Sequence, residues 1–295
     1  MCKISAILPV YNVGKYIRQC LESIERQTFG DFEVLCIDDC GTDDSVDIIN
    51  EFINKDSRFK LIRHDKNKGQ AAARNTGFDS ANGEYIICID PDDIVDVTEF
   101  EVVNRAFAEH EDVDCIWFNA GVYDERTGEK KVIYTDEYVF NKNGYYEINP
   151  DNIYLSADYI WNKAFRTSVI RKYNLKFPEG IALGEDAEFY YKAFTQIKKI
   201  YYIHKCLYVY RLRGDSTVDK AKKGTLNLKD TFTVYMNIFN YLKENNILQD
   251  YKKALYYLLV LRINNRKMPN QNEKVIRMAD EVLSKINFPD DFIEN

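Results

Sequence analysis

The sequence lacks the features that mark several large classes of protein. Its seven cysteines are scattered and none forms a CxxC pair, so we expect no disulfide framework, no zinc site and a reducing cytosol as the compartment. The formal net charge is −7, which gives little support to non-specific nucleic-acid binding. The longest apolar run, Ala254 to Leu261, is far below the roughly 18 residues that indicate a membrane span. Because Met1-Cys2-Lys3 leads directly into a strand pattern, no secretory leader is predicted, and we expect a soluble cytoplasmic protein.

Strand patterns and amphipathic helices alternate through the first 120 residues. Apolar runs with β-forming residues predict strands at 3–10, 32–37, 59–62, 85–89 and 114–118, with helical patterns between them. This alternation predicts βαβ units and a mainly parallel sheet, which is an α/β fold. The polar stretch 121–160 predicts irregular connections or short antiparallel strands. Two strand-like runs follow at 200–203 and 207–212, and the chain is mostly helical from residue 225.

The chain is organised around the stretch 84–93. Tyr85 to Ile89 is a continuous apolar run, as in a strand that is buried on both faces. It ends in three carboxylates, Asp90, Asp92 and Asp93, with Pro91 among them. Ligand sites in open α/β sheets lie at the carboxyl ends of strands, and clustered carboxylates repel one another unless a hard cation lies among them. The stretch therefore indicates an Mg²⁺ or Mn²⁺ site, and a solvated acidic turn is the alternative.

A second acidic pair, Asp38 and Asp39, ends the strand at 32–37. These carboxylates can bind a metal or accept hydrogen bonds from a nucleotide base and ribose. No glycine-rich phosphate loop accompanies them, so any phosphates would need neutralisation by a cation at Asp90 and Asp92. Three arginines are candidates to assist: Arg74, Arg211 and Arg213.

Asp186 is a lone carboxylate at the predicted start of a helix, where the helix dipole favours the ionised form. An ionised carboxylate beside a substrate hydroxyl can act as a general base. The alternative is a helix N-cap, and sequence position leaves both interpretations open.

Six motifs occur in one order along the chain. They are Pro9-Val10-Tyr11-Asn12, Asp38-Asp39 with Gly41-Thr42-Asp43-Asp44-Ser45, Asn67-Lys68-Gly69 with Ala73-Arg74-Asn75, Asp90-Pro91-Asp92-Asp93, Trp161-Asn162-Lys163 and Gly184-Glu185-Asp186. With this order and spacing, residues 4 to 215 resemble the inverting GT-A glycosyltransferases of family 2. The resemblance implies a GT-A Rossmann-like mixed sheet flanked by helices at 1–215. Its nucleotide-sugar half would span residues 1–120 and its acceptor half 121–215, with a helical segment at 216–295.

The resemblance also implies an activity. A metal-dependent enzyme of this kind moves a sugar from a nucleotide-diphosphate donor, usually UDP-linked, to an acceptor hydroxyl. Asp186 would take the proton from that hydroxyl as it attacks the anomeric carbon opposite the leaving diphosphate, and one displacement inverts the configuration. The acceptor would be a glycan or a lipid-linked molecule in bacterial surface-polysaccharide biosynthesis.

The resemblance assigns individual roles on the donor side. Tyr11 would lie against the base, Asp39 would accept from the pyrimidine ring, and Arg74 would line the nucleotide pocket. Asp92 would ligate Mn²⁺ or Mg²⁺, with Asp90 nearer the ribose and the metal waters. The donor-binding set is Pro9, Val10, Tyr11, Asn12, Asp38, Asp39, Lys68, Gly69, Arg74, Asp90, Pro91, Asp92, Arg211 and Arg213. The acceptor-side set is Trp161, Asn162, Lys163 and Glu185.

Two departures and several alternatives qualify this interpretation. Cys40-Gly41 replaces the usual Gly-Ser, and Pro91 fills a place often held by a small residue; both departures alter the loops and leave the carboxylates in position. A metal-dependent phosphohydrolase would also place a D-x-D after a strand, although normally after the first one. A sugar nucleotidyltransferase would need a glycine- and arginine-rich loop that is missing. A non-catalytic sugar-nucleotide-binding protein would be expected to have lost Asp186 or the metal carboxylates.

The C-terminal segment carries a local excess of positive charge. Between Lys220 and Met278 there are 12 Lys and Arg residues against 4 Asp and Glu residues. Aromatic residues are interleaved with them, among them Phe232, Tyr235, Phe239, Tyr256 and Tyr257. Basic helices with aromatic residues can lie on anionic bilayers, so peripheral contact with the inner face of the plasma membrane is one hypothesis. A helical packing domain with a solvated basic face is the alternative.

Overall fold

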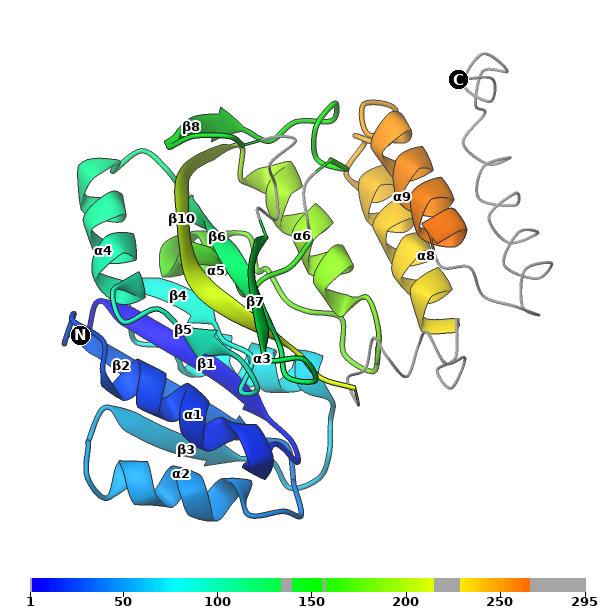
Figure 1. The fold of residues 1–295 in the computed structure, drawn as a ribbon. Helices are drawn as coiled ribbons and strands as arrows, with labels where there is room; N and C mark the ends of the chain where they lie inside the picture. Colours follow the sequence, from blue (N-terminus) through cyan, green and yellow to red (C-terminus); the bar gives the residue numbers. More distant parts are fainter. Residues whose placement is uncertain (1, 134–139, 156–157, 215–228, 266–295) are drawn as a thin grey trace.

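A mixed ten-stranded sheet forms the centre of the molecule (Figure 1). The structure is a computed structural model, and it describes residues 2–133, 140–155, 158–214 and 229–265. The order of its main strands is β3-β2-β1-β4-β9-β6-β10-β5, with β7 paired to β6 and β8 paired to β10. The predicted α/β fold with a mixed sheet is confirmed.

The first half consists of the predicted βαβ units. Strand β1 pairs in parallel with both β2 and β4, and β2 pairs in parallel with β3. The elements are β1 (Ile4–Val10), α1 (Gly14–Glu25), β2 (Phe32–Asp38), α2 (Ser45–Ile53), β3 (Phe59–Arg63), α3 (Gln70–Ser80) and β4 (Tyr85–Cys88). Because these strands are parallel and adjacent, their carboxyl ends meet at one edge of the sheet.

The second half departs from the parallel pattern. Strand β9 lies between β4 and β6 and is antiparallel to both, while β10 runs parallel to β6. The elements are β5 (Ile94–Val95), α4 (Glu99–Glu109), β6 (Cys115–Asp124), β7 (Glu129–Ile133), β8 (Gly144–Glu147), β9 (Lys163–Arg166), α5 (Thr167–Lys172), α6 (Glu185–Gln196) and β10 (Lys199–Leu212). The two runs expected at 200–203 and 207–212 are one strand, because irregular pairing with β6 around Cys206 carries the strand through the polar residues between them.

Helices cover both faces of the sheet. Alternate side chains of a strand point to opposite faces, and Ala6 and Ile7 of β1 accordingly lie in different clusters of buried residues. Helices α1, α2 and α4 contribute to one cluster, and α3, α5 and α6 contribute to the other. This burial on both faces explains the continuous apolar runs of β1, β2 and β4.

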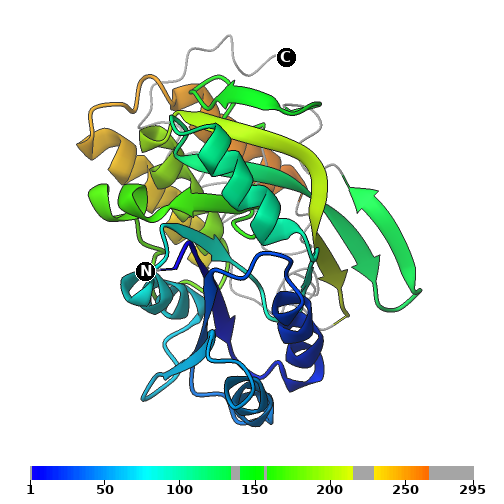
Figure 2. The ribbon, with the colours of Figure 1, turned by 90° about the vertical axis from the view of Figure 1, so that its left-hand side faces the viewer.

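The C-terminal helices α8 (Lys229–Glu244) and α9 (Lys252–Asn265) extend the second cluster beyond α6. Seen in both views, they lie at the opposite end of the molecule from α1 and α2 (Figures 1 and 2). Tyr235 and Phe239 of α8 are 3% and 6% exposed, and Tyr257 of α9 stacks on Tyr154 with ring centroids 4.5 Å apart. The Tyr235 and Phe239 rings are buried and so are not available to a bilayer, whereas Tyr257 is half-buried. Membrane contact by this segment stays a prediction.

The rest of that hypothesis falls partly outside the described residues. These exclude 215–228 and 266–295 of the basic stretch and give no account of the Phe232 side chain. Among the helices that the structure describes, none combines the length and apolarity needed to cross a membrane.

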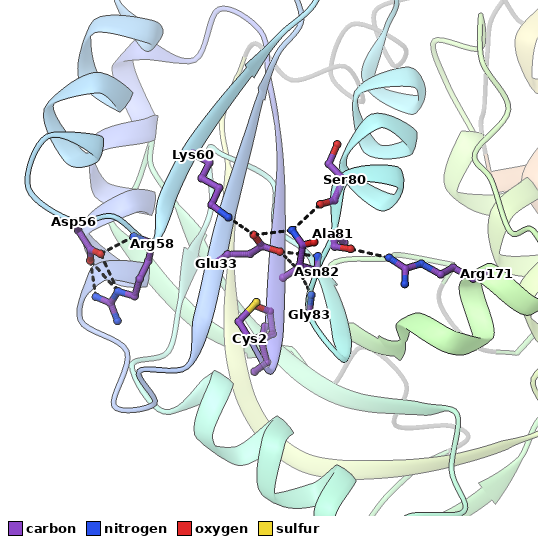
Figure 3. A network of polar contacts seen from close by, with 12 residues as sticks. Cys2, Glu33, Asp56, Arg58, Lys60, Ser80, Ala81, Asn82, Gly83 and Arg171 are labelled. Atoms are coloured by element: carbon purple, nitrogen blue, oxygen red, sulfur yellow. Dashed lines mark hydrogen bonds and ion pairs between the residues drawn. The ribbon is translucent and has the colours of Figure 1, made fainter.

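A polar network closes the amino-terminal edge of the sheet (Figure 3). Glu33, at the start of β2, is 3% exposed and accepts hydrogen bonds from Ser5 Oγ, Lys60 Nζ and the Asn82 main-chain N–H, each at 2.7 Å. The main-chain N–H of Gly83 donates to Ser5 Oγ at 2.8 Å. A Cβ at Gly83 would lie 2.5 Å from the Ser5 nitrogen, so only glycine permits this close approach. The network fixes the turn between α3 and β4.

Candidate active site

The site lies at the opposite edge, where β1, β2 and β4 end. Val10 of β1 pairs with Asp38 of β2, and the Asp39 N–H donates to the Val10 carbonyl oxygen at 2.8 Å. Asp90 follows β4 two residues after Cys88. Both acidic motifs therefore lie at one edge of the sheet.

Asp38 and Asp39 are both buried, and each is held by its own set of donors. Asp38 pairs with Arg63 Nε at 3.0 Å. Asp39 Oδ1 accepts from the Lys68 N–H at 2.8 Å, and Asp39 Oδ2 accepts from the Gly69 N–H at 2.7 Å. Gly69 has φ = +89°, a conformation that favours glycine, which explains its place immediately before α3. Asp39 thus shapes the loop that opens α3.

His64 is part of this group, and sequence reasoning missed it. Its Nδ1 lies 2.7 Å from Asp39 Oδ1 and its Nε2 lies 2.9 Å from Thr76 Oγ1. Asp39 and Thr76 thus hold the imidazole at both of its ring nitrogens. Arg63 and His64 lie at the carboxyl end of β3. Ligand sites in open α/β sheets lie at the carboxyl ends of strands, so the same rule that pointed to β2 and β4 could have pointed to these two residues.

The motif Pro9-Val10-Tyr11-Asn12 lies beside Asp38, with which Val10 pairs. Pro9 and Val10 are buried in β1, whereas Tyr11 is 49% exposed. Asn12 has φ = +51°, and its Oδ1 accepts from the Thr42 N–H at 2.8 Å. This contact joins the loop after β1 to the loop after β2 and leaves the Tyr11 ring accessible.

The loop after β4 is tied to β10. Asp93 is 1% exposed and accepts from Tyr208 Oη and from the Arg211 N–H, both at 2.7 Å. Arg211 Nε donates to the Asp92 carbonyl oxygen at 2.7 Å. Burial and the neighbouring Asp92 raise the pKa of Asp93 well above its usual value. Asp93 is therefore a structural carboxyl, and Pro91 is buried beside it.

Asp92 and Asp90 remain nearer the surface, and each already has an arginine partner. Asp92 Oδ2 lies 2.8 Å from Arg213 Nε, and Asp90 Oδ1 lies 2.9 Å from Arg74 Nη2. Within the described part of the chain, no three His, Cys, Asp or Glu side chains converge to hold a metal ion. The two carboxylates provide oxygen ligands that suit Mn²⁺ or Mg²⁺, but a cation here would need further oxygens from a bound ligand.

One buried guanidinium connects this loop to Asp186. The Arg74 side chain is 2% exposed, and its Nη1 lies 2.6 Å from Asp186 Oδ1 and 3.5 Å from Glu185 Oε1. Arg74 thus contacts three carboxylates, Asp90 on one side and the two at the start of α6 on the other. Its side chain therefore lies between the loop after β4 and the start of α6.

Asp186 is not the helix N-cap. The N-cap of α6 is Gly184, with φ = +96°, and Asp186 is the second residue of the helix. Although 24% of the Asp186 side chain is exposed, burial raises its pKa to about 7, with Glu185 and Asp90 acting in the same direction and Arg74 opposing them. A carboxyl with this pKa can exchange a proton at neutral pH, which is the property that a general base requires.

The Trp161-Asn162-Lys163 motif is almost entirely buried. Asn162 and Lys163 are 0% exposed, and the Lys163 ammonium donates to Asn162 Oδ1 at 2.7 Å and to the Tyr159 carbonyl oxygen. It also lies 3.7 Å from the centroid of the Trp117 ring. Asn162 and Lys163 thus lie beneath the surface, and Trp161 is 5% exposed. Their acceptor-side role stays a prediction.

Comparisons with known proteins agree with this geometry. The family described as Glycosyl transferase family 2 matches residues 5–173. EpsH of Bacillus subtilis (strain 168), which is named as a glycosyltransferase, is 31% identical over 88% of this chain and 74% of its own length. GgaB of the same organism, a minor teichoic acid biosynthesis protein, is 28% identical over 96% of this chain and 32% of its own.

The fold has a close counterpart among solved structures. Staphylococcus aureus TarS 1–349 in complex with UDP-GlcNAc superposes with a TM-score of 0.76 at 23% identity, covering 96% of this chain and 80% of TarS 1–349. This likeness confirms the mixed α/β architecture. On the family match and the relatives together, the chain belongs to glycosyl transferase family 2 and is a glycosyltransferase of the GT-A fold.

Proposed function

We propose that this enzyme transfers a sugar from a UDP-sugar to an acceptor hydroxyl with inversion, and that Asp186 is the general base. The observation that carries the proposal is the Arg74 bridge, which places Asp186 and the carboxylate loop after β4 on one guanidinium. A carboxyl that can accept a proton at neutral pH thus lies beside the edge of the sheet where a nucleotide would bind.

The donor site is proposed from the ends of β1, β2 and β3. Tyr11, with half of its surface accessible, would lie against the base. Asp39 Oδ2 accepts a hydrogen bond from the Gly69 N–H and, as a carboxylate oxygen, has the capacity to accept another from a pyrimidine N–H. The solved TarS complex with UDP-GlcNAc supports a UDP-linked donor.

The reaction is a single displacement. The acceptor oxygen forms a bond to the anomeric carbon while the bond from that carbon to the diphosphate oxygen breaks, and the leaving UDP takes the electron pair. The proton of the acceptor hydroxyl passes to an Asp186 carboxylate oxygen. Arg74 holds Asp186 Oδ1 and so orients the carboxylate.

A divalent cation, Mn²⁺ or Mg²⁺, is part of the proposal. Asp92, with Asp90 beside it, would hold the ion together with diphosphate oxygens of the donor, and the bound ion would neutralise charge on the leaving group. Arg213, which pairs with Asp92, and Arg211 would supply further positive charge near the diphosphate.

The biological acceptor is proposed as a glycan or lipid-linked molecule of a bacterial surface polymer. The relative GgaB, named for minor teichoic acid biosynthesis, supports this class. A cytoplasmic location, with peripheral contact at the inner face of the plasma membrane through basic side chains, is part of the same proposal.

The test is a product analysis with UDP-GlcNAc, UDP-glucose and UDP-galactose in Mn²⁺, with a panel of glycoside acceptors. We expect UDP release that depends on the acceptor, and an anomeric coupling in the product opposite to that of the donor. Retained configuration would contradict the single displacement. Release of inorganic phosphate would favour a phosphohydrolase, and binding of UDP-sugars without turnover would favour a non-catalytic binding protein.

A further inference from the structure

Four aromatic rings form a column that runs from the carboxylate loop to the surface. Trp161 stacks on Tyr208, with centroids 4.7 Å apart and planes 14° apart, and on Tyr210, at 5.8 Å and 12°. Tyr208 and Tyr210 are two residues apart on β10 and so project from the same face of the strand. Tyr159 stacks on Trp161 at 5.0 Å and 17°.

The inner end of the column is fixed to the loop that carries Asp90 and Asp92. Tyr208 Oη donates to Asp93 Oδ2 at 2.7 Å and accepts from the Asp90 N–H at 3.1 Å. Burial, followed by the carboxylates of Asp93, Asp90 and Asp92, raises the pKa of Tyr210. Both tyrosines of β10 therefore lie close to the proposed reaction centre.

The outer end is exposed and held in place. Tyr159 is 45% exposed, whereas Trp161 is 5% exposed. The Tyr159 carbonyl oxygen accepts a hydrogen bond from the buried Lys163 ammonium, which lies 5.6 Å from the ring centroid of Tyr190 on α6. The same ammonium contributes to the electrostatic environment of Asp186. Tyr159 is thus an exposed residue whose carbonyl oxygen is held by the ammonium that also acts on the proposed base.

We propose that the exposed face of Tyr159, backed by Trp161, is a stacking platform for a pyranose ring of the acceptor; this rests on the proposed function. A pyranose presents a face of C–H groups with partial positive charge, and the face of an aromatic ring carries negative charge, so the two surfaces attract each other and also bury apolar area. The platform belongs to the 121–215 half, and its anchor Lys163 adjoins α6, which carries Asp186. These positions favour the sugar of the acceptor over the sugar of the donor.

The test measures binding of methyl β-glycosides of glucose, galactose and N-acetylglucosamine by saturation-transfer NMR in the presence of UDP. We expect at least one glycoside to bind, with saturation concentrated on the C–H groups of one ring face. Tyr159→Phe keeps the ring and should keep this binding. Tyr159→Leu keeps an apolar cover over Trp161 but removes the aromatic face, and should weaken binding by about fivefold to tenfold.

Tyr145→Ala is the matched control. Tyr145 is 50% exposed and also contacts other rings, but it lies on β8, where it packs against His110 and Tyr201. It should leave glycoside binding unchanged. Absence of binding by every glycoside, or equal binding by the Tyr159→Leu and Tyr145→Ala variants, would overturn the platform. Thermal unfolding of each variant confirms that it is folded.

A second measurement distinguishes the two sources of a sugar ring. Calorimetry should give the same affinity of the parent and of Tyr159→Leu for UDP-GlcNAc and for UDP. If Tyr159→Leu weakens UDP-GlcNAc but not UDP, the platform holds the sugar of the donor and the acceptor assignment is wrong. Failure of the parent to bind either UDP or UDP-GlcNAc would instead count against the proposed donor site, whatever the glycosides do.

Discussion

At the two edges of the central sheet, the pKa of a buried carboxyl is shifted in opposite directions. At the amino-terminal edge, burial would raise the pKa of Glu33, but hydrogen bonds from Lys60, Ser5 and Asn82 outweigh it and the pKa is lowered. At the carboxyl-terminal edge, burial dominates at Asp186 and raises the pKa to about 7 despite the contact with Arg74. One carboxyl is held ionised, and the other is left able to take up a proton.

The difference follows from how donors and acceptors are balanced. Glu33 is one carboxylate with three close donors, so its charge is fully compensated. Arg74 is one cation shared by Asp90, Glu185 and Asp186, so negative charge is in excess around it. A fully paired carboxylate contributes to stability, whereas an incompletely paired one keeps the chemistry that a catalyst needs.

The largest expected effect is on turnover, at Asp186. Asp186→Asn keeps the size of the side chain but removes its ability to take a proton at neutral pH. General-base catalysis contributes about 10²–10⁴ in rate, so kcat should fall at least that far, with UDP-GlcNAc affinity nearly unchanged. Steady-state UDP release and calorimetry measure the two quantities. Glu185→Gln is the control and should lower kcat less than Asp186→Asn does. A larger fall in kcat for Glu185→Gln would mean that Glu185 is the base.

The sequence was sufficient to locate the carboxylates but not their partners. The ends of β2 and β4 follow from apolar runs that stop at Asp38 and Asp90, and Asp186 follows from its motif. The contact of Arg74 with Asp186 joins residues 112 apart, and the contact of Tyr208 with Asp93 joins residues 115 apart. No periodicity encodes such pairs, because they depend on how α6 and β10 pack on the first half.

The fold shows the same limit. Strands buried on both faces were predictable from continuous apolar runs, but β9 was not, because it is a four-residue strand inserted between β4 and β6. The continuity of β10 was also missed, since His204 and Lys205 interrupt its apolar pattern. Tertiary pairing, rather than local preference, decides both cases.

The second prediction concerns the cation proposed at Asp92. If the carboxyl-terminal edge is built to hold Mn²⁺ with a donor, Asp92→Ala should reduce UDP-GlcNAc affinity in Mn²⁺ to the level measured without metal. The Asp92 side chain is 16% exposed and pairs with Arg213, so thermal unfolding is needed to check that the variant is folded. Calorimetry with and without Mn²⁺ gives the result. Unchanged affinity in Mn²⁺ would show that Asp92 does not bind the metal, and Glu33→Gln should leave the metal dependence intact.

The opposite pKa shifts at the two edges predict opposite dependences of stability on pH. Between about pH 4 and pH 7, Asp186 is protonated in the folded state and ionised in the unfolded state, so its effect on stability becomes less favourable as pH rises. In denaturant unfolding across this window, the unfolding free energy of Asp186→Asn should rise relative to that of the parent by roughly 1–4 kcal/mol as the pH increases. A constant difference across the window would contradict the raised pKa of Asp186.

The smallest effect, and the one that would break the comparison most directly, is expected at Glu33. Its pKa is lowered on folding, so its contribution to stability is fully present above the ordinary glutamate range and is lost as pH falls through the folded value. Glu33→Gln keeps the shape but turns an amide N–H₂ towards groups that are themselves donors, which should cost about 1–3 kcal/mol of unfolding free energy at pH 7. Because Glu33 lies at the edge opposite Asp186, kcat per folded molecule should not change. A fall in kcat with unfolding free energy preserved would mean that the amino-terminal edge also serves catalysis. The distinction between a structural amino-terminal edge and a catalytic carboxyl-terminal edge would then be wrong.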